Sequence, residues 1–520
     1  MSPGMNPISA LVWFIRRWFW NIFGWIKMAG NKPLDIPLPP KTQASVTPIA
    51  LAQQVPALPI KTILVCPQDA IPVDERSGKK ELVYKLQLAL YKVFSPMQAG
   101  LPPIAADPDT ALAQAYTWLH RTKYNPPLLP AEYLGSPDLG ALAVRGPFAC
   151  YTTWESEGVY QWDLAGLSNY AHHEGLHKLG AKVRFKVDAT QRCLRAFEIS
   201  TGLGVVGLRD AGWELAKKIA LCAVSTHLSL VRHFNWVHLA CGAHLAMASR
   251  NHLPADHAVG RLLWPYHYGT AQSNDIVTRG QMLPGGDFET TFSLSFEGMC
   301  QLFADSYLEF PFITNDPEAD AAARRLREGG FDVPSQDNQE ALFAVMHTHA
   351  LDYLQHYYSD VPAGSATAQL RNDGALLDWL DGLNTYIPNG VAVTRDDVTL
   401  ASLARLVARF MYMACVQHEL LGSFVWNYQL WTHRQPVRVY QSGEREPLDV
   451  YLRLVNANYN LNVTRRALMF DFSYLALDAP GQAAMVKFER ELKALQAQMA
   501  REPWAVWKMY PDMLKVNINA

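Results

Sequence analysis

The segment from residue 211 to residue 250 reads AGWELAKKIALCAVSTHLSLVRHFNWVHLACGAHLAMASR, with His233 and His238 in its apolar centre. Its length and apolar character predict a long buried helix. On an ordinary α-helix, however, side chains five residues apart point about 140° away from each other. A local π-turn would bring the two histidines onto one face, and Asn235 and Gly242 make such an irregularity easier. From spacing alone, buried structural histidines and a pair of metal ligands are both open.

Helical patterns also dominate the rest of the chain, whereas only a few short strands are expected around residues 143–200. The clearest of these patterns lie at 339–358, 397–431 and 482–500. Hydrophobic residues make up 49% of the 520 residues and charged residues 18%, which is typical of a folded, core-rich protein. We therefore predict a mainly α fold, in which one large helical catalytic domain contains a few short strands.

Charge and cysteine content exclude several classes of protein. The formal net charge is −2, so nothing indicates a nucleic-acid partner. The seven cysteines are odd in number and scattered, and none forms a CxxC pair. A disulfide framework is therefore not expected, and a reducing compartment is the default.

The N-terminal stretch 8–27 is crowded with aromatic and aliphatic residues. At about 100° per residue, Arg16, Arg17, Asn21 and Lys27 fall on one side of a helical wheel and most apolar residues on the other. This segregation predicts an amphipathic helix that lies in a membrane interface. A partner-binding helix and a cleaved signal are the alternatives, whereas three cations within the stretch argue against a spanning helix.

Residues 31–60 contain seven prolines, which predicts an extended linker. From Thr62 onward there is no repeat and no second linker of this kind. The predicted organisation is therefore an amphipathic helix at 1–30, a linker at 31–61 and a catalytic domain at 62–520. Such a protein would be cytoplasmic or peripheral to a membrane.

Two other histidine groups compete for a chemical role. His173-Glu174-Gly175-Leu176-His177 fits H-E-x-x-H, which on a helix places two zinc ligands beside a glutamate base. Gly175 lies inside the motif and makes a sound helix doubtful, so a surface cluster is the competing interpretation. His252 and His257 flank a proline, which favours a loop that ends a helix and structural histidines.

In their order and spacing, several short motifs resemble those of the iron-binding region of lipoxygenases. The resemblance covers about residues 145–520, and it is specific because many motifs agree in order rather than because one is decisive. The motifs are Gln161-Trp-Asp-Leu164-Ala-Gly166-Leu-Ser-Asn169, Leu215-Ala216-Lys217, His233 with His238, Arg250-Asn-His-Leu253-Pro254-Ala-Asp-His257, Thr270-Ala-Gln-Ser-Asn274, Tyr307-Leu-Glu-Phe310-Pro311, Tyr357-Tyr358-Ser359-Asp360, Leu377-Asp378-Trp379, Cys415-Val-Gln417-His418 and Tyr510-Pro511-Asp512.

This resemblance implies a non-haem metal centre. Its ligands would be His233, His238, His418 and the main-chain carboxylate of Ala520, because the family folds its last residue onto the metal. Three neutral imidazoles and a carboxylate suit iron as Fe²⁺ and Fe³⁺, with Mn as the second choice.

The sequence also departs from the family pattern. Gly422 stands four residues after His418, where relatives carry Asn, His or Ser as a weak ligand, so an open or water-filled position is expected there. Ala520 replaces the usual Ile, and Tyr268 replaces an Arg of many relatives. The N-terminal β-barrel of many eukaryotic relatives is missing from this sequence, and the helix at 8–27 would stand in for it.

The activity that the resemblance implies is insertion of O₂ into a polyunsaturated fatty acid. A ferric hydroxide would take a hydrogen atom from the CH₂ of a 1,4-diene, and O₂ would add to the resulting radical. One alternative is a diverged iron enzyme that oxidises or rearranges another lipid or a lipid hydroperoxide, which Gly422 supports. The other is a zinc hydrolase that uses His173, Glu174 and His177.

Overall fold

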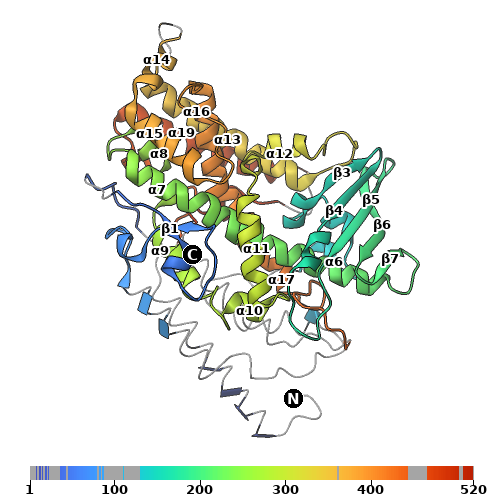
Figure 1. Cartoon of the computed structure of the whole chain (residues 1–520). Helices are drawn as coiled ribbons and strands as arrows, with labels where there is room; N and C mark the ends of the chain where they lie inside the picture. The colour runs from blue at the N-terminus through green and yellow to red at the C-terminus, as the bar shows by residue number, and fades with distance from the viewer. Residues whose placement is uncertain are drawn as a thin grey trace.

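The computed structural model describes residues 35–41, 45–78, 129–359, 364–442, 465–502 and 508–518, with scattered positions 7–8, 11–12, 14–15, 18–19, 22, 81–82, 85–86, 109–110 and 362. Within these residues the architecture is mainly α, as the sequence predicts. Most of the long helices gather in one body, and a five-stranded sheet lies at its side (Figure 1).

A nearly continuous helix through the core carries His233 and His238. It consists of α6 (Trp213–His227), a π-helix at Leu228–Gly242 and α7 (Ala243–His252). Both junctions keep right-handed helical dihedrals, so the helix continues while its hydrogen-bond pattern changes. The π-type irregularity that would bring His233 and His238 onto one face is present, and it extends over 15 residues.

A second helical run faces this π-helix. It begins as α16 (Leu400–Tyr412) and continues as two π-helical segments, Met413–Gln417 and Glu419–Phe424, with His418 between them. Both segments contact the π-helix at Leu228–Gly242. The core of the molecule therefore holds two π-helical runs side by side.

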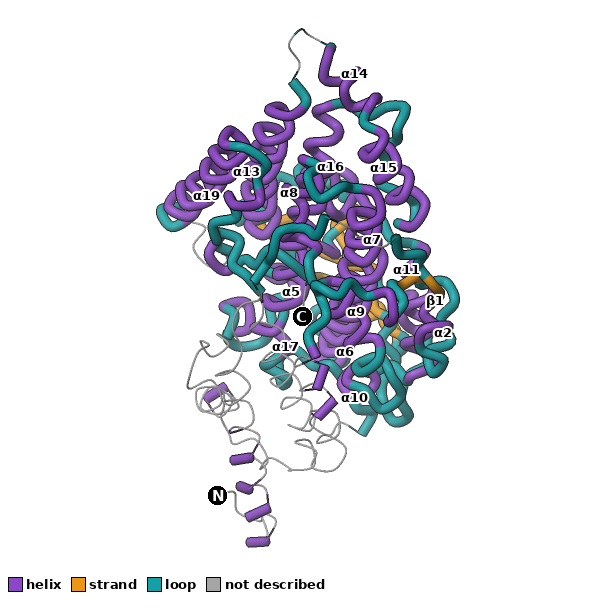
Figure 2. The backbone as a smooth tube through the Cα atoms, turned by 90° about the vertical axis from the view of Figure 1, so that its left-hand side faces the viewer, coloured by secondary structure: helices purple, strands orange, loops and turns teal. Residues whose placement is uncertain are grey.

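Other helices surround these two runs. The long α13 (Pro334–Tyr357) packs against α16 and against α19 (Ala479–Met499) (Figure 2). On the side of the first run, α15 (Gly374–Tyr386) packs against α7, and α11 (Phe296–Leu308) packs against the π-helix. The π-helical runs are thereby shielded from solvent over most of their length.

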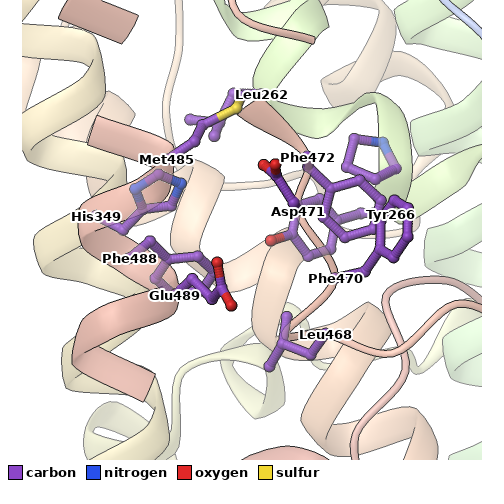
Figure 3. A pocket seen from close by; sticks show the side chains of 11 residues that line it. Leu262, Tyr266, His349, Leu468, Phe470, Asp471, Phe472, Met485, Phe488 and Glu489 are labelled. Carbon is purple, nitrogen blue, oxygen red and sulfur yellow. The ribbon is translucent and has the colours of Figure 1, made fainter. Parts of the chain in front are cut away.

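A small aromatic pocket lies between α8 (Ala258–His267), α13 and α19 (Figure 3). His349 stacks on Phe488 at one side of it, with ring centroids 4.2 Å apart, and Tyr266 and Phe470 lie across from them. The space open to a water-sized molecule is about 20 Å³, which holds roughly one water molecule. A lipid chain does not fit this pocket.

The sheet consists of five antiparallel strands that lie side by side in sequence order. They confirm the prediction of short strands around residues 143–200. The strands are β3 (Thr153–Ser156), β4 (Val159–Asp163), β5 (Ala181–Asp188), β6 (Cys193–Thr201) and β7 (Gly204–Gly207). Alternate residues Ala181, Val183 and Phe185 of β5 are buried, so one face of the sheet packs on the protein.

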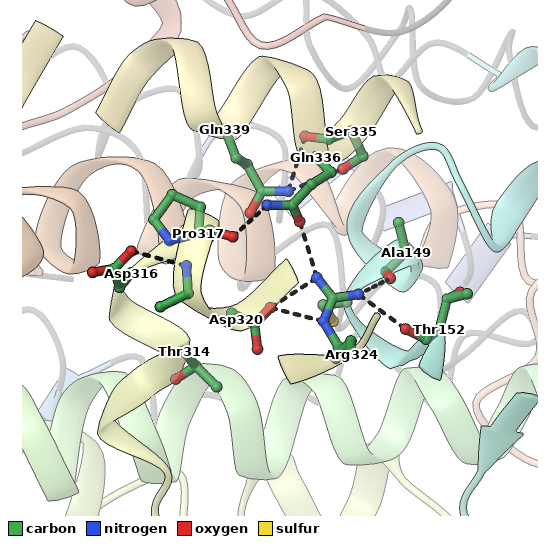
Figure 4. Close-up of polar contacts among 12 residues, drawn as sticks. Ala149, Thr152, Thr314, Asp316, Pro317, Asp320, Arg324, Ser335, Gln336 and Gln339 are labelled. Atoms are coloured by element: carbon green, nitrogen blue, oxygen red, sulfur yellow. Dashed lines mark hydrogen bonds and ion pairs between the residues drawn. The ribbon is translucent and has the colours of Figure 1, made fainter. Parts of the chain in front are cut away.

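A buried arginine attaches the start of the sheet to the helices (Figure 4). Arg324 follows α12 (Pro317–Ala323) and donates hydrogen bonds to the carbonyl oxygens of Ala149 at 3.1 Å and Thr152 at 3.0 Å. The same guanidinium contacts the Asp320 carboxylate at 2.8 Å and the Gln336 side chain of α13 at 2.9 Å. Because a buried charge needs such partners, the contacts lock these elements together.

Part of the proline-rich segment packs into the core, which differs from the linker that its prolines predicted. β1 (Ile49–Ala50) pairs with β2 (Leu64–Val65), and the short helix α2 (Leu51–Gln54) follows β1. Leu51 and Leu58 are fully buried. The apolar side chains between the prolines gain burial, which outweighs the tendency of prolines to stay extended in solvent.

The residues that follow the proline-rich segment are bound to α7 by an ion pair between Glu75 and Arg250. The buried Glu75 carboxylate accepts hydrogen bonds from Nε and Nη2 of Arg250 at 3.0 and 2.7 Å. The guanidinium also lies over the Trp264 ring, 4.7 Å from its centroid. Residues 45–78 are thus bound to the helices that build the core.

The described positions between 7 and 22 are helical, and several of their apolar side chains are exposed. The remaining residues of the helix expected at 8–27 lie outside the described part of the chain. Among the described residues, no helix has both the length and the apolar character that crossing a bilayer requires.

Buried histidines make the stability of this fold depend on pH. Burial lowers the pKa of His244, His267 and His349 to about 3 from an ordinary 6.5. The unfolded chain therefore binds more protons between pH 6.5 and 3, and the free energy of unfolding falls as the pH drops through that window. Each group contributes at most about 1.4 kcal/mol per pH unit.

We expect the urea midpoint to fall between about pH 7.5 and about pH 5, and His349→Gln to reduce this fall. The substitution removes the imidazole that takes up a proton in the unfolded chain, so the dependence of stability on pH should weaken. The lost stacking on Phe488 lowers stability by the same amount at every pH. Identical pH slopes for the two proteins would contradict the assignment.

Candidate metal centre

Three histidines from the two π-helical runs meet in the core. His233 and His238 come from the first run, and His418 lies between the two segments of the second. One ring nitrogen from each lies within 4.8 Å of the other two. The ring centroids are 4.9–5.0 Å apart. Among the His, Cys, Asp and Glu side chains that the structure describes, this is the one group of three or more that is close enough to share a metal ion.

The spacing of two nitrogens fits a metal ion between them. Nε2 of His418 lies 3.1 Å from Nε2 of His238. Two ligands at right angles, each about 2.1 Å from a metal, are about 3.0 Å apart. Nε2 of His233 is buried and has no hydrogen-bond partner in the described residues, as expected of a nitrogen reserved for a metal.

The imidazoles are electrically suited to bind a cation. Burial, followed by the proximity of His418 and His238, holds the pKa of His233 well below its ordinary value. Burial, followed by the charge of Arg465, does the same to the pKa of His418. These rings are therefore neutral at pH 7, and a neutral imidazole is the form that ligates a metal.

An asparagine sets the ring of His238. The Asn274 amide donates to the carbonyl oxygen of His238 at 3.0 Å, and its Oδ1 lies 3.1 Å from Nδ1 of the same residue. The oxygen accepts, so Nδ1 carries the proton and Nε2 presents its lone pair to the centre. Asn274 comes from α9 (Thr270–Thr278), which contacts the π-helix.

Gly422 does not leave an open space, which corrects the expectation from the sequence. A Cβ atom at this position would lie 2.7 Å from Nε2 and 2.9 Å from Cε1 of His233. The ring of His233 therefore occupies the place where a side chain at position 422 would point. The glycine is needed because the two π-helical runs approach so closely that only a bare backbone leaves room for the imidazole.

The C-terminal segment enters the core beside the same π-helix. The amide of Val516 donates to the carbonyl oxygen of Arg466 at 3.0 Å, and Ile518 is fully buried. The side chain of Ile518 fills the place where a Cβ atom on Gly242 would stand. Gly242 thus admits the tail four residues beyond His238. Ala520 itself lies outside the described residues, so its role as a ligand stays a prediction.

Tyr268 links the tail to the N-terminal segment. Its hydroxyl donates to the carbonyl oxygen of Asp74 at 2.6 Å, while its own carbonyl oxygen accepts from the Asn517 amide at 3.2 Å. Asp74 and Asn517, far apart in sequence, are therefore both bound to the C-cap residue of α8.

The structure does not assemble the H-E-x-x-H motif as a zinc site. Glu174 and Gly175 form a turn rather than a helix, and Gly175 has a φ of 76°. Nε2 of His173 is hydrogen-bonded to the carbonyl oxygen of Glu289 at 2.8 Å. The motif needs a helix to bring His173 and His177 onto one face, and the turn removes it.

The pair at His252 and His257 is structural, as its proline suggests. α7 ends at His252, and Nε2 of His257 contacts the Asp373 carboxylate at 3.0 Å. Sequence reasoning did not single out Arg465, which contacts His418, because no pattern around it signals its position. Glu419, which adjoins His418, forms an ion pair with this arginine.

The site is a three-histidine centre inside a mainly helical protein, and known structures share this fold. Comparison with protein-family models and with curated protein sequences finds no match. The manganese lipoxygenase of Gaeumannomyces graminis superimposes with a TM-score of 0.72 at 13% identity, over 92% of this chain and 96% of its own. Coral 8R-lipoxygenase gives 0.72 at 13% identity, over 90% and 80%.

A lipoxygenase variant in complex with arachidonate gives a TM-score of 0.71 at 13% identity, over 90% of this chain and 80% of its own. The chain therefore has the lipoxygenase fold. This confirms the fold that the order of the short motifs implied.

Gly422→Ala tests the close packing at the centre. The added methyl group meets the ring of His233, which must shift away from the other two histidines. We expect metal content to fall at least tenfold, consistent with the cost of displacing one ligand. Gly374→Ala is the matched control, because a Cβ atom there meets nothing within 4 Å. Full metal content in the Gly422→Ala protein would show that the ring has room to move.

Proposed function

We propose that the protein is a non-haem iron dioxygenase that inserts O₂ into a polyunsaturated fatty acid. The convergence of His233, His238 and His418 inside a lipoxygenase fold carries the proposal. The metal would be held by these residues and by the main-chain carboxylate of Ala520. Iron is preferred and manganese is the alternative, since one structural neighbour is a manganese lipoxygenase.

Bound iron would supply one-electron chemistry, which can remove a hydrogen atom from the CH₂ of a 1,4-diene and leave a radical that combines with O₂. The chain supplies geometry and a dry setting. Asn274 orients His238, and the centroid of the Phe234 ring lies 5.3 Å from that of the His238 ring. Leu420 and Leu421, which follow His418 closely in sequence, are also buried. Such a setting keeps water from a reactive lipid radical.

The proposed ligand at Ala520 is supported by the path of the tail. Ile518 is buried against Gly242, in the π-helix that carries His233 and His238. Two further residues reach about 7 Å when extended. Gly242 is about 6 Å from His238 along a helix axis, so the proposed ligand is within the reach of two extended residues.

The substrate class rests on similarity and on the chemistry of the site. One structural neighbour was solved in complex with arachidonate, a polyunsaturated fatty acid. The second candidate, a diverged enzyme acting on another lipid or a lipid hydroperoxide, drew its support from Gly422. Because His233 fills that position, the glycine no longer favours a different reaction.

His418→Ala tests the metal site and the reaction together. We expect the purified protein to contain iron and to consume O₂ with linoleate or arachidonate. The variant should lose more than nine-tenths of both, because loss of a ligand costs at least the roughly tenfold that loss of a ligand's hydrogen-bond partner costs. His173→Ala should keep both, because His173 takes no part in the centre. Extending the chain by one residue after Ala520 should also lower iron content, since the carboxylate must then move.

Four outcomes would count against the proposal. Zinc in place of iron, or iron retained at full occupancy in the His418→Ala protein, would remove the metal assignment. Iron without O₂ uptake on any 1,4-diene fatty acid would leave the metal site and refute the dioxygenase. Loss of metal in the His173→Ala protein would return the zinc interpretation.

We also propose that the N-terminal helix binds a membrane surface. Apolar side chains at Ile8, Leu11, Phe14, Ile15 and Trp18 are 48–71% exposed. They recur three or four residues apart, as a helix face that enters a lipid interface requires.

The triple variant Leu11→Glu, Ile15→Glu and Trp18→Glu should lose binding to phosphatidylcholine–phosphatidylserine vesicles in a co-sedimentation assay. Leu203→Glu, at another exposed apolar position, is the control and should bind like the wild type. Equal sedimentation of the triple variant and the wild type would refute this membrane role.

A further inference from the structure

A buried arginine lies directly behind His418. The Nη1 atom of Arg465 is 2.8 Å from Nδ1 of His418, on the side of the ring that faces away from His238. The side chains of Arg465 and His418 are 1% and 2% exposed. The contact is therefore made without competing water, where a hydrogen bond from a charged group is strong.

Two neighbours of His418 hold this arginine. The Glu419 carboxylate forms an ion pair with Nη1 of Arg465, and it is also only 2% exposed. The Ser423 hydroxyl accepts from Nη2 at 3.1 Å. These three partners of the guanidinium come from one helical stretch, 418–423. Arg465 thus spans this stretch like a brace, and its planar fork has little freedom to rotate.

A buried ion pair of this kind is weak evidence for stability alone. Removing two charges from water is costly, and apolar residues of similar volume often give equal or greater stability. The pair Arg465–Glu419 is also placed where its geometry affects a neighbour, since one N–H group points at an imidazole nitrogen. A role in orienting that imidazole accounts for both its burial and its position.

The direction of the hydrogen bond adds a specific consequence. A guanidinium can only donate, so Nδ1 of His418 accepts. In the metal-free protein the ring then carries its proton on Nε2, next to Nε2 of His238 at 3.1 Å. This is opposite to His238, whose proton lies on Nδ1 because Asn274 accepts there. For a metal ion to bind Nε2 of His418 this proton has to leave to solvent, and the ring would then be an imidazolate whose negative charge the guanidinium on Nδ1 offsets.

We propose that Arg465 is a positioning residue of the metal centre and that Glu419 fixes Arg465 in turn. Arg465 holds the ring of His418 with Nε2 toward His238, so the two nitrogens are set at the spacing of metal ligands before a metal arrives. The inference rests on the metal site proposed above. It assigns a second layer of contacts to His418 that is unlike the neutral amide behind His238.

The test removes the contact of Arg465 with His418 and leaves no unpaired charge in the core. The double variant Arg465→Met and Glu419→Gln removes both charges together, and Arg465→Lys keeps a cationic donor. Iron affinity is measured by competition with a chelator under anaerobic conditions. We expect the double variant to bind 10–100-fold more weakly, the range for lost partners of metal-ligating histidines, and Arg465→Lys to recover part of the loss.

A second measurement does not depend on bound metal. In metal-free protein with ¹⁵N-labelled histidine, the His418 signal, assigned by its absence in His418→Ala, should report the Nε2–H tautomer. The double variant should shift it toward the Nδ1–H form, because no guanidinium then donates to Nδ1. The amide oxygen of Glu419→Gln can accept from Nδ1–H instead, since Glu419 Oε1 lies 3.8 Å from Nδ1 in the wild type. A ring that is Nδ1–H in the wild type would overturn the proposal.

Arg324→Met is the control for general damage. Arg324 is also a buried arginine, but its partners are the carbonyl oxygens of Ala149 and Thr152 and the side chains of Asp320 and Gln336. This variant should lose stability with unchanged iron affinity per folded molecule. Equal iron affinity of the double variant and the wild type would overturn the positioning role. If the wild type binds no metal, the proposed function fails, and the tautomer measurement still decides the Arg465 contact.

Discussion

Two π-helical runs have to approach closely enough for imidazoles from both to meet, and much of the structure follows from this approach. Where the runs are nearest, Gly422 has no side chain, and the ring of His233 takes the space. At the end of the first run, Gly242 makes room for Ile518 of the tail. Glycine within a helix costs about 1 kcal/mol relative to alanine. The surrounding core offsets that cost, since the faces of both runs are buried among large apolar side chains.

The same approach explains why the polar groups of the centre need partners outside it. An imidazole buried among apolar groups has no water to hold its outer nitrogen, so the protein must supply a donor or an acceptor. For His238 this is the amide of Asn274, from a helix that packs on the π-helix. For His418 it is the guanidinium of Arg465, from the segment that pairs with the C-terminal tail. The centre thereby ties together four separate parts of the chain.

Several elements follow from patterns along the sequence. The helical patterns at 339–358 and 482–500 appear as α13 and α19, and the five-residue spacing of His233 and His238 appears as a π-helix. Periodicity of this kind is local, because each residue faces the core or solvent according to its own turn of helix. The proline-rich segment was harder to predict. Its described residues from position 45 pack through Leu51 and Leu58 against groups far away in sequence, and no local pattern reports such partners.

The sequence alone determined the mainly helical fold and the order of the histidine motifs, because both follow from the spacing of residues along the chain. Only the tertiary structure decided what stands next to what. His173 and His177 fit a zinc motif in sequence but flank a turn. His418, in contrast, is 180 positions from His238, and their Nε2 atoms are 3.1 Å apart. Gly422 looked like a missing ligand until the ring of His233 was found in its place. Arg465, 47 positions from His418, has no local signal at all, since a hydrogen bond across the core depends on how helices pack rather than on periodicity.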